Sequence, residues 1–275
     1  MKSLEDFNDV PYHATKYKSV NVNSKEITGI SVFEDGTLAF ADFSNKTMTR
    51  LNHNYTQRDK IELVGNPIAL CITGPQEVAL ALRHEKKIQF VTCDKELSLS
   101  NSFTTPMICT GLGYDSTCDH LYVCLGAKWA NTKSACVSAY RKDGTLLKTY
   151  ENNESGTPIF TSPNHIAVAS DFLYIADRDR GLIALNKDGK SLWTFEDEKL
   201  KRAWGVCLLS NSKLLVTGVY SNNIIQVSTD GKKINELLGA SERLKQPFTV
   251  AFDKLNYRIL VGCESNALNV YTLSK

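Results

Sequence analysis

The sequence lacks the features of a membrane protein, a secreted protein or a strongly basic nucleic-acid binder. No segment approaches the ~18 consecutive apolar residues of a membrane-spanning helix. The formal net charge of the 275 residues is only +2, so no basic excess indicates DNA or RNA. Residues 1–10 contain acidic side chains and no apolar core, so we expect no secretory signal peptide. We therefore expect neither a membrane nor a DNA partner.

Metal and disulfide motifs are also missing. None of the eight cysteines belongs to a CxxC pair or lies at zinc-finger spacing from a histidine. Most lie within apolar runs, as Cys71 does between Leu70 and Ile72. We interpret them as reduced, buried, apolar side chains and expect a cytoplasmic protein with no metal and no cofactor.

What the chain does contain is a repeat of short apolar strands. Equivalent positions in the first strand of each unit are separated by 40, 42, 54, 40 and 44 residues, and they are Ile30, Leu70, Leu112, Ile166, Val206 and Val250. A period of ~40–50 residues with four strands per unit is typical of propeller blades. The longest interval contains a polar insertion at residues 127–134, which we interpret as a loop between the second and third strands of its unit.

One unit displays the four-strand pattern most clearly, with runs at 163–168, 172–177, 181–185 and 191–195. The dipeptide Asp-Gly recurs at predicted turns, where glycine accepts a positive φ. It occurs at Asp35-Gly36, Asp143-Gly144, Asp188-Gly189 and Asp230-Gly231. Helical periodicity is almost absent. We therefore predict an all-β fold, a six-bladed β-propeller.

The sixth unit has only three strands before the chain stops at Lys275. Residues 15–22, which precede the first unit, form a strand-like segment that could supply the fourth. Such pairing would close the ring and protect its edges. We expect residues 1–11 to be a loose lead-in and residues 12–275 to form a single propeller.

The units resemble NHL repeats, which start with Pro-x-Gly-aliphatic-Ala and have a second strand ending in Ala-Asp. The matching residues here are Pro163 to Val168 with Leu173 to Asp177, and Gly29 to Val32 with Leu38 to Asp42. The whole chain is similar to the C-terminal propellers of tripartite-motif-like proteins from invertebrates, molluscs especially. The resemblance implies a protein-recognition domain that selects substrates in a ubiquitin-ligase context. RING spacing is missing from this chain, so ligase chemistry is not expected in it.

In propellers of this type, one face collects the starts of the first strands and the loops between the second and third strands. The candidate binding residues on this face are cationic and aromatic, a mixture that suits an acidic peptide or single-stranded RNA. They are Lys86, Lys128, Trp129, His165, Arg178, Arg180, Trp204, Tyr220 and Asn222.

Structural roles compete with binding for several of these residues. Trp204 lies where a packing aromatic is common, and His165 occupies a position usually held by glycine. Arg178 and Arg180 alternate with acidic residues, which is compatible with a solvated ion-pair loop. Trp129 lies in the polar insertion, where nothing demands a core residue. Both interpretations therefore stay open at this stage.

An enzyme is the remaining alternative, because six-bladed propellers include calcium-dependent lactonases. Calcium requires six to eight oxygen ligands, yet only Asn164 and Glu26 lie at suitable positions, and Trp204 stands where an acidic ligand would be expected. No Gly-x-Ser-x-Gly, His-Glu-x-x-His or phosphate-loop motif occurs. We therefore predict no enzyme activity. The predicted function is a non-catalytic, protein-binding scaffold, with RNA binding as the alternative and a calcium-dependent lactonase or esterase as a minor one.

Overall fold

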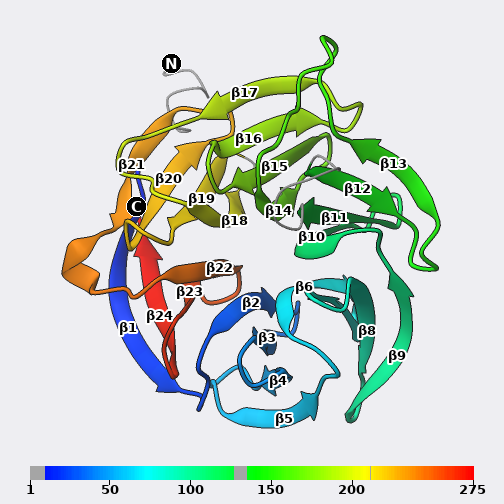
Figure 1. Cartoon of the computed structure of the whole chain (residues 1–275). Helices are drawn as coiled ribbons and strands as arrows, with labels where there is room; N and C mark the ends of the chain where they lie inside the picture. The colour runs from blue at the N-terminus through cyan, green and yellow to red at the C-terminus, as the bar shows by residue number, and fades with distance from the viewer. Residues whose placement is uncertain (1–9, 127–134, 211) are drawn as a thin grey trace.

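The computed structural model, which describes residues 10–126, 135–210 and 212–275, has six four-stranded antiparallel sheets in a ring around a central axis, which we call the channel (Figure 1). Blades 1 to 3 contain, in order, β2 (Ile27–Val32), β3 (Leu38–Asp42), β4 (Thr47–Leu51) and β5 (Gln57–Glu62); β6 (Pro67–Gly74), β7 (Glu77–Leu82), β8 (Lys87–Cys93) and β9 (Leu97–Thr104); and β10 (Ile108–Asp115), β11 (His120–Gly126), β12 (Cys136–Tyr140) and β13 (Leu146–Tyr150). The first strand of each of these blades contacts the first strand of the next one.

Blades 4 to 6 continue the ring. They contain β14 (Pro163–Val168), β15 (Phe172–Asp177), β16 (Gly181–Asn186) and β17 (Ser191–Phe195); β18 (Ala203–Ser210), β19 (Lys213–Gly218), β20 (Asn223–Ser228) and β21 (Lys233–Leu238); and β22 (Pro247–Asp253), β23 (Arg258–Cys263), β24 (Ala267–Ser274) and β1 (His13–Asn21). A short 3₁₀ helix, η2 (Ala240–Glu242), precedes blade 6. The predicted six-bladed, all-β fold is confirmed.

The ring closes by pairing strands from the two ends of the sequence. β1 pairs antiparallel with β24, in a register that runs from His13 opposite Ser274 to Asn21 opposite Ala267. Tyr12, just before β1, donates its backbone N–H to the side chain of Gln226 in blade 5. The predicted completion of the last blade by an N-terminal strand is therefore confirmed. The predicted lead-in lies mostly outside the described residues, and the division at residue 12 stays a prediction.

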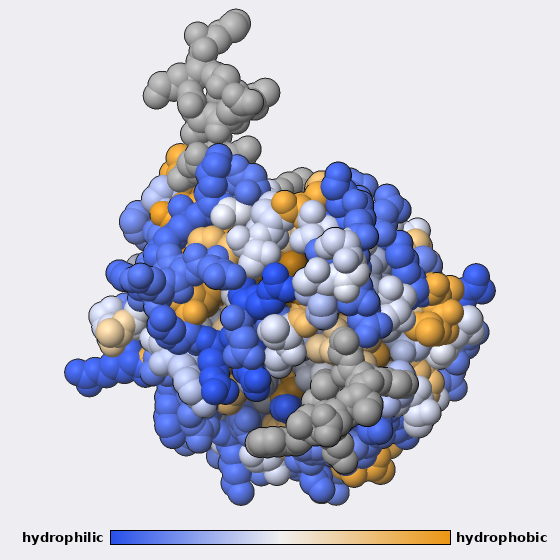
Figure 2. Space-filling model, turned by 45° about the horizontal axis from the view of Figure 1, so that its top comes forward, coloured by the Kyte–Doolittle hydropathy of each residue, from blue (hydrophilic) through white to orange (hydrophobic). Residues whose placement is uncertain are grey.

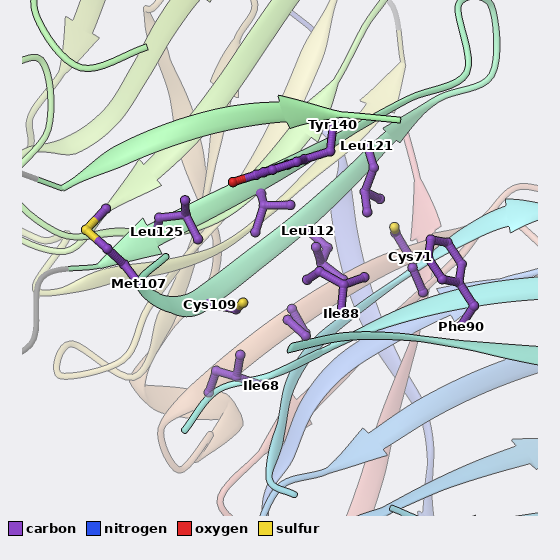
Figure 3. Close-up of a cluster of buried hydrophobic side chains, with 14 of the residues drawn as sticks. Ile68, Cys71, Ile88, Phe90, Met107, Cys109, Leu112, Leu121, Leu125 and Tyr140 are labelled. Carbon is purple, nitrogen blue, oxygen red and sulfur yellow. The ribbon is translucent and has the colours of Figure 1, made fainter. Parts of the chain in front are cut away.

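Apolar side chains hold neighbouring blades together, because the inner strands are buried on both faces and therefore run apolar without strict alternation. Six clusters of buried side chains occur in the described part of the chain, each shared mainly by two adjacent blades. Figure 3 shows the cluster between blades 2 and 3, in which Phe90 and Leu112 belong to opposite sides of the interface. The fourth strands are mostly solvent-exposed, as β13 illustrates.

The Asp-Gly turns have the predicted backbone conformation. Their glycines adopt φ values of +79° at Gly36, +89° at Gly144, +93° at Gly189 and +88° at Gly231. A side chain at such positive φ values would be strained, so these four turns depend on glycine. No helix among residues 10–126, 135–210 and 212–275 is long and apolar enough to cross a membrane.

Candidate functional site at the channel mouth

The first and second strands of every blade meet at one end of the channel, which we call the mouth. Five of the six first strands carry a bulged residue there, and the fifth blade has a two-residue irregularity containing Trp204. Thr28, Thr110 and Asn164 use this position to donate hydrogen bonds to a backbone carbonyl of the following blade, at 2.8, 2.5 and 3.0 Å. These bonds align the first strands around the channel and fix the geometry of the mouth.

Trp204 occupies the corresponding position in blade 5 and behaves differently. Its ring lies 5.4 Å from that of Phe248 in blade 6, and it also packs against the cluster shared by blades 2 and 3, which contains Ile68 and Met107. A residue of blade 5 that reaches blades 2 and 3 must extend across the channel. Its Nε1 is inaccessible to solvent and has no hydrogen-bond partner among the described residues. Trp204 therefore forms an apolar floor with one unused donor.

His165 of β14 lies at a position where the other blades have small residues. Gly29, Gly111 and Gly205 hold the equivalent places, and a Cβ on each would lie within 3 Å of a backbone atom of the next blade. His165 is only half-buried, but its Nδ1 is inaccessible and has no hydrogen-bond partner in the described chain. Burial lowers the pKa of His165 to about 4, against a smaller opposing effect of the Val206 backbone. The imidazole is therefore neutral at physiological pH.

Six residues, each at the end of a second strand or directly after it, form a ring around this floor. Its members are Phe43, Arg83, Gly126, Arg178, Val219 and Glu264. Burial lowers the pKa of Arg83, Arg178 lowers it further, and Glu26 raises it. The charges of blades 1, 2 and 4 thus act on one another across the mouth, although Arg83 forms no ion pair within 4 Å in the described chain.

Two carboxylates complete the mouth. Burial raises the pKa of Glu26, which accepts a hydrogen bond from Ser44 Oγ at 3.0 Å; Glu264 and Asp42 raise this pKa further. Glu264 accepts a hydrogen bond from Gln246 Nε2 at 2.7 Å. Sequence reasoning missed Arg83 and Glu264. The signal that could have found Arg83 is its place directly after a second strand, which is the place that Arg178 holds in blade 4.

The predicted binding residues are only partly brought together. His165, Trp204 and Arg178 contribute to the mouth. Arg180 instead donates hydrogen bonds to two backbone carbonyls of the loop before β14, and Tyr220 is 60% exposed beneath the guanidinium of Arg202.

Asn222 accepts a hydrogen bond from the backbone N–H of Gln246, and Lys86 lies in the β7–β8 loop with a positive φ of 50°. Lys128 and Trp129 lie outside the described residues. The role of the nine residues as one binding face therefore stays a prediction.

The acidic residues at the ends of two second strands are structural. Asp42 accepts hydrogen bonds from the backbone N–H groups of Lys25 and Asn45, and Asp177 accepts them from Thr161 and Ser162. The bonds from Lys25, Thr161 and Ser162 tie each second strand to the segment leading into its own blade, whereas the bond from Asn45 holds the loop between β3 and β4.

An open cleft of about 840 Å³ lies on the opposite face, between blades 1 and 2. Two of its charged residues already have partners: Arg50 pairs with Asp59 through two hydrogen bonds and with backbone carbonyls, and Asp35 accepts hydrogen bonds from Thr37. Because Arg83, His165 and Trp204 each have a buried polar atom without a hydrogen-bond partner in the described chain, we place the candidate site at the mouth rather than in this cleft.

A metal centre built from charged ligands is not present among the described residues, where no three His, Cys, Asp or Glu side chains are grouped to hold an ion. Asn164, one of the two residues considered for calcium, donates its side-chain amide to Ala203 O.

No family model and no curated protein sequence matches this chain. Solved structures do match it. Streptogramin B lyase is similar over 96% of this chain and 98% of its own, with 12% identity and a TM-score of 0.67. The luciferin-regenerating enzyme matches over 96% of both chains, with 14% identity and a TM-score of 0.73. A chain of the nidogen/laminin complex matches over 82% of this chain and 85% of its own, with 16% identity and a TM-score of 0.66.

This chain shares their fold. At these identities the likeness establishes the propeller architecture alone. A propeller of this architecture also occurs in a protein complex, as the nidogen/laminin structure demonstrates.

The comparisons correct the predicted function. We predicted a non-catalytic scaffold and no enzyme activity, and both predictions are wrong, because enzymes are prominent among the matched structures of this fold. The RNA-binding alternative, part of the same prediction, has no support in them. The error came from treating a missing motif as evidence. Enzymes that share this fold at 12–14% identity need not share any sequence motif.

Proposed function

We propose that the chain is an enzyme of the lyase or hydrolase type, which converts a small molecule at the channel mouth with His165 as the proton acceptor. The observation that carries this proposal is a neutral imidazole in a partly desolvated position, where the other blades have small side chains. Strained or unsatisfied polar groups beside a channel are typical of functional sites rather than of structural cores.

The surroundings of His165 support a small ligand. An apolar floor of Trp204, Ile68 and Met107 lies beside a polar rim that includes Arg83 and Glu26. Ligand sites commonly combine apolar walls with a few polar groups that fix orientation. Figure 2 displays a largely hydrophilic surface with only small, separated hydrophobic patches, so the visible face offers no broad apolar area for docking a large partner.

The chemistry follows from protonation states. A neutral imidazole can remove a proton from carbon next to a carbonyl group, so that a leaving group departs, or from a water molecule that attacks the carbonyl carbon. Both reactions develop negative charge on the carbonyl oxygen. The proton then resides on His165 until it is passed to the leaving group or to water.

The test is a substrate panel of simple esters, lactones and β-substituted carbonyl compounds, followed by ¹H NMR. We expect the wild-type chain to convert at least one compound class. The rate of this conversion should be at least ~100-fold lower in His165→Asn. His53→Asn is the matched control, because His53 is exposed on the opposite face. Equal conversion by the folded His165→Asn protein, or no conversion of any compound, would overturn the proposal.

Catalysis does not preclude a protein partner, and we also propose that the chain has one. The nidogen/laminin structure, in which a propeller of this architecture belongs to a protein complex, supports this. A cytoplasmic location is likewise proposed. All eight cysteines are free, which is compatible with a reducing compartment. The finer resemblance to tripartite-motif propellers is retained only as a hypothesis about ancestry.

A further inference from the structure

Arg83 differs from Arg178 and Arg180 in having no acceptor for its guanidinium among the described residues. Arg178 pairs with Asp179 at 3.2 Å, and Arg180 donates to backbone carbonyls. The side chain of Arg83 is half-buried, its Nε is inaccessible, and no hydrogen bond or ion pair to a described residue engages it. A partly desolvated guanidinium without an acceptor is costly, and a bound carboxylate would remove that cost.

The carboxylates that could have satisfied Arg83 are held elsewhere. Glu26 accepts a hydrogen bond from Ser44, and Glu264 is bound by Gln246 and lies 3.6 Å from the ammonium of Lys245. Neither lies within 4 Å of Arg83. Arg178 is close enough for its charge to act on Arg83, and the charge of Glu26 opposes this effect without a direct ion pair.

The floor inside the ring is apolar. In the antiparallel pair of Pro67 with Leu82, Arg83 lies one residue toward the loops of the mouth and Ile68 lies one residue deeper along the channel. Ile68 belongs to the cluster on which Trp204 packs, and Trp204 also contacts Phe248. A ligand bound to Arg83 therefore meets hydrocarbon and aromatic surface as soon as it extends inward.

We propose that the mouth binds small carboxylates with an apolar body, whose carboxylate is held by Arg83, with Arg178 adding attraction, and whose body packs on Trp204. The assignment of this site as a substrate site rests on the proposed function, whereas the binding itself does not. Arg83 then has the role of an anion anchor, and His165 lies at the part of the ligand that is farther inside.

Binding is tested with hexanoate and its uncharged analogue 1-hexanol, by following the indole N–H signal of Trp204 in ¹⁵N NMR titrations. We expect hexanoate to bind at least ten-fold more tightly than hexanol, and Arg83→Gln to remove that advantage. Arg83→Lys keeps the positive charge and should retain most of the affinity advantage of hexanoate. Arg178→Gln should reduce this advantage two- to three-fold. Arg58→Gln, on the opposite face, is the control and should change nothing.

The proposal is overturned if hexanoate binds no better than hexanol, or if its advantage survives in a folded Arg83→Gln protein. Failure of the proposed function is distinguishable from this result. His165→Asn should abolish conversion yet leave the hexanoate affinity within two-fold of wild type. If the protein converts no substrate but binds hexanoate in the charge-dependent way, the proposed anion site stands and only the proposed enzyme activity is refuted.

Discussion

The titration of His165 gives the most direct test of the mouth as described. Its pKa is about 4 in the folded chain and about 6.5 in the unfolded one. Between these two values the unfolded state binds more protons, so the free energy of unfolding must fall as the pH falls from about 6.5 to about 4. Below pH 4 both states are protonated and this contribution no longer changes.

The magnitude follows from the two pKa values. Between pH 7 and pH 5 this one group should lower the free energy of unfolding by about 2 kcal/mol. His165→Asn removes the titrating group, and contributions common to both proteins cancel in the comparison. The variant can be less stable at pH 7 because of imperfect packing, so the readout is the change between the two pH values rather than stability itself.

Urea unfolding of both proteins at pH 5, 6 and 7, monitored by circular dichroism, measures this difference. We expect the wild-type stability to fall by about 2 kcal/mol more than that of His165→Asn. Parallel pH dependence in the two proteins would show that the His165 imidazole is well solvated and that its neutral state carries no functional meaning. A ¹H–¹⁵N NMR titration of the imidazole supplies an independent pKa.

Three further predictions concern the ring. Gly111→Ala should destabilise the chain by about 2 kcal/mol in denaturant unfolding, because its Cβ would lie 2.5 Å from the backbone oxygen of Asn164; an unchanged midpoint would refute this close approach. Lys187→Met should lower the free energy of unfolding by about 3 kcal/mol at pH 7, because Lys187 pairs with buried Asp115 and holds the pKa of Asp115 well below the usual range. This loss of stability should shrink as the pH falls and the carboxyl of the unfolded state is protonated. A loss that does not depend on pH would indicate a packing defect instead. A chain starting at Val22 lacks β1 and should melt at lower temperature and aggregate through the exposed edge of β24, as light scattering during heating would reveal; an unaltered, monodisperse melt would mean that β1 is dispensable.

Sequence periodicity predicted most of the fold because every blade must solve the same packing problem. Leu70, Ile166 and Val206 recur at blade spacing, since each fills the same gap between neighbouring first strands. The Asp-Gly turns were predictable from local conformation alone. The closing pair of strands was predictable from counting, because the sixth unit has only three strands and the strand-like segment at residues 15–22 belongs to no other unit.

The mouth was less predictable, since its residues belong to different blades. Arg178 was recognised because blade 4 carries a clear Ala-Asp ending before it, whereas Arg83 follows Leu82 in a blade without that ending. The reach of Trp204 across the channel depends on side-chain length and on a local irregularity of β18, neither of which repeats in the sequence. The proposed enzyme activity was not predicted, because a few unpartnered groups leave no periodic signal.

The pairing of β1 with β24 also determines how the ring responds to force. His13 lies opposite Ser274, so both free ends of the chain leave the pair at the same end. A pull applied between the two ends loads the residue pairs one at a time, starting with His13 and Ser274 and then Ala14 and Leu273. This unzipping geometry makes the β1–β24 pair mechanically weak, even though thermal unfolding must break all its residue pairs together. The ring should therefore open at its seam under small loads while the other five blades stay intact.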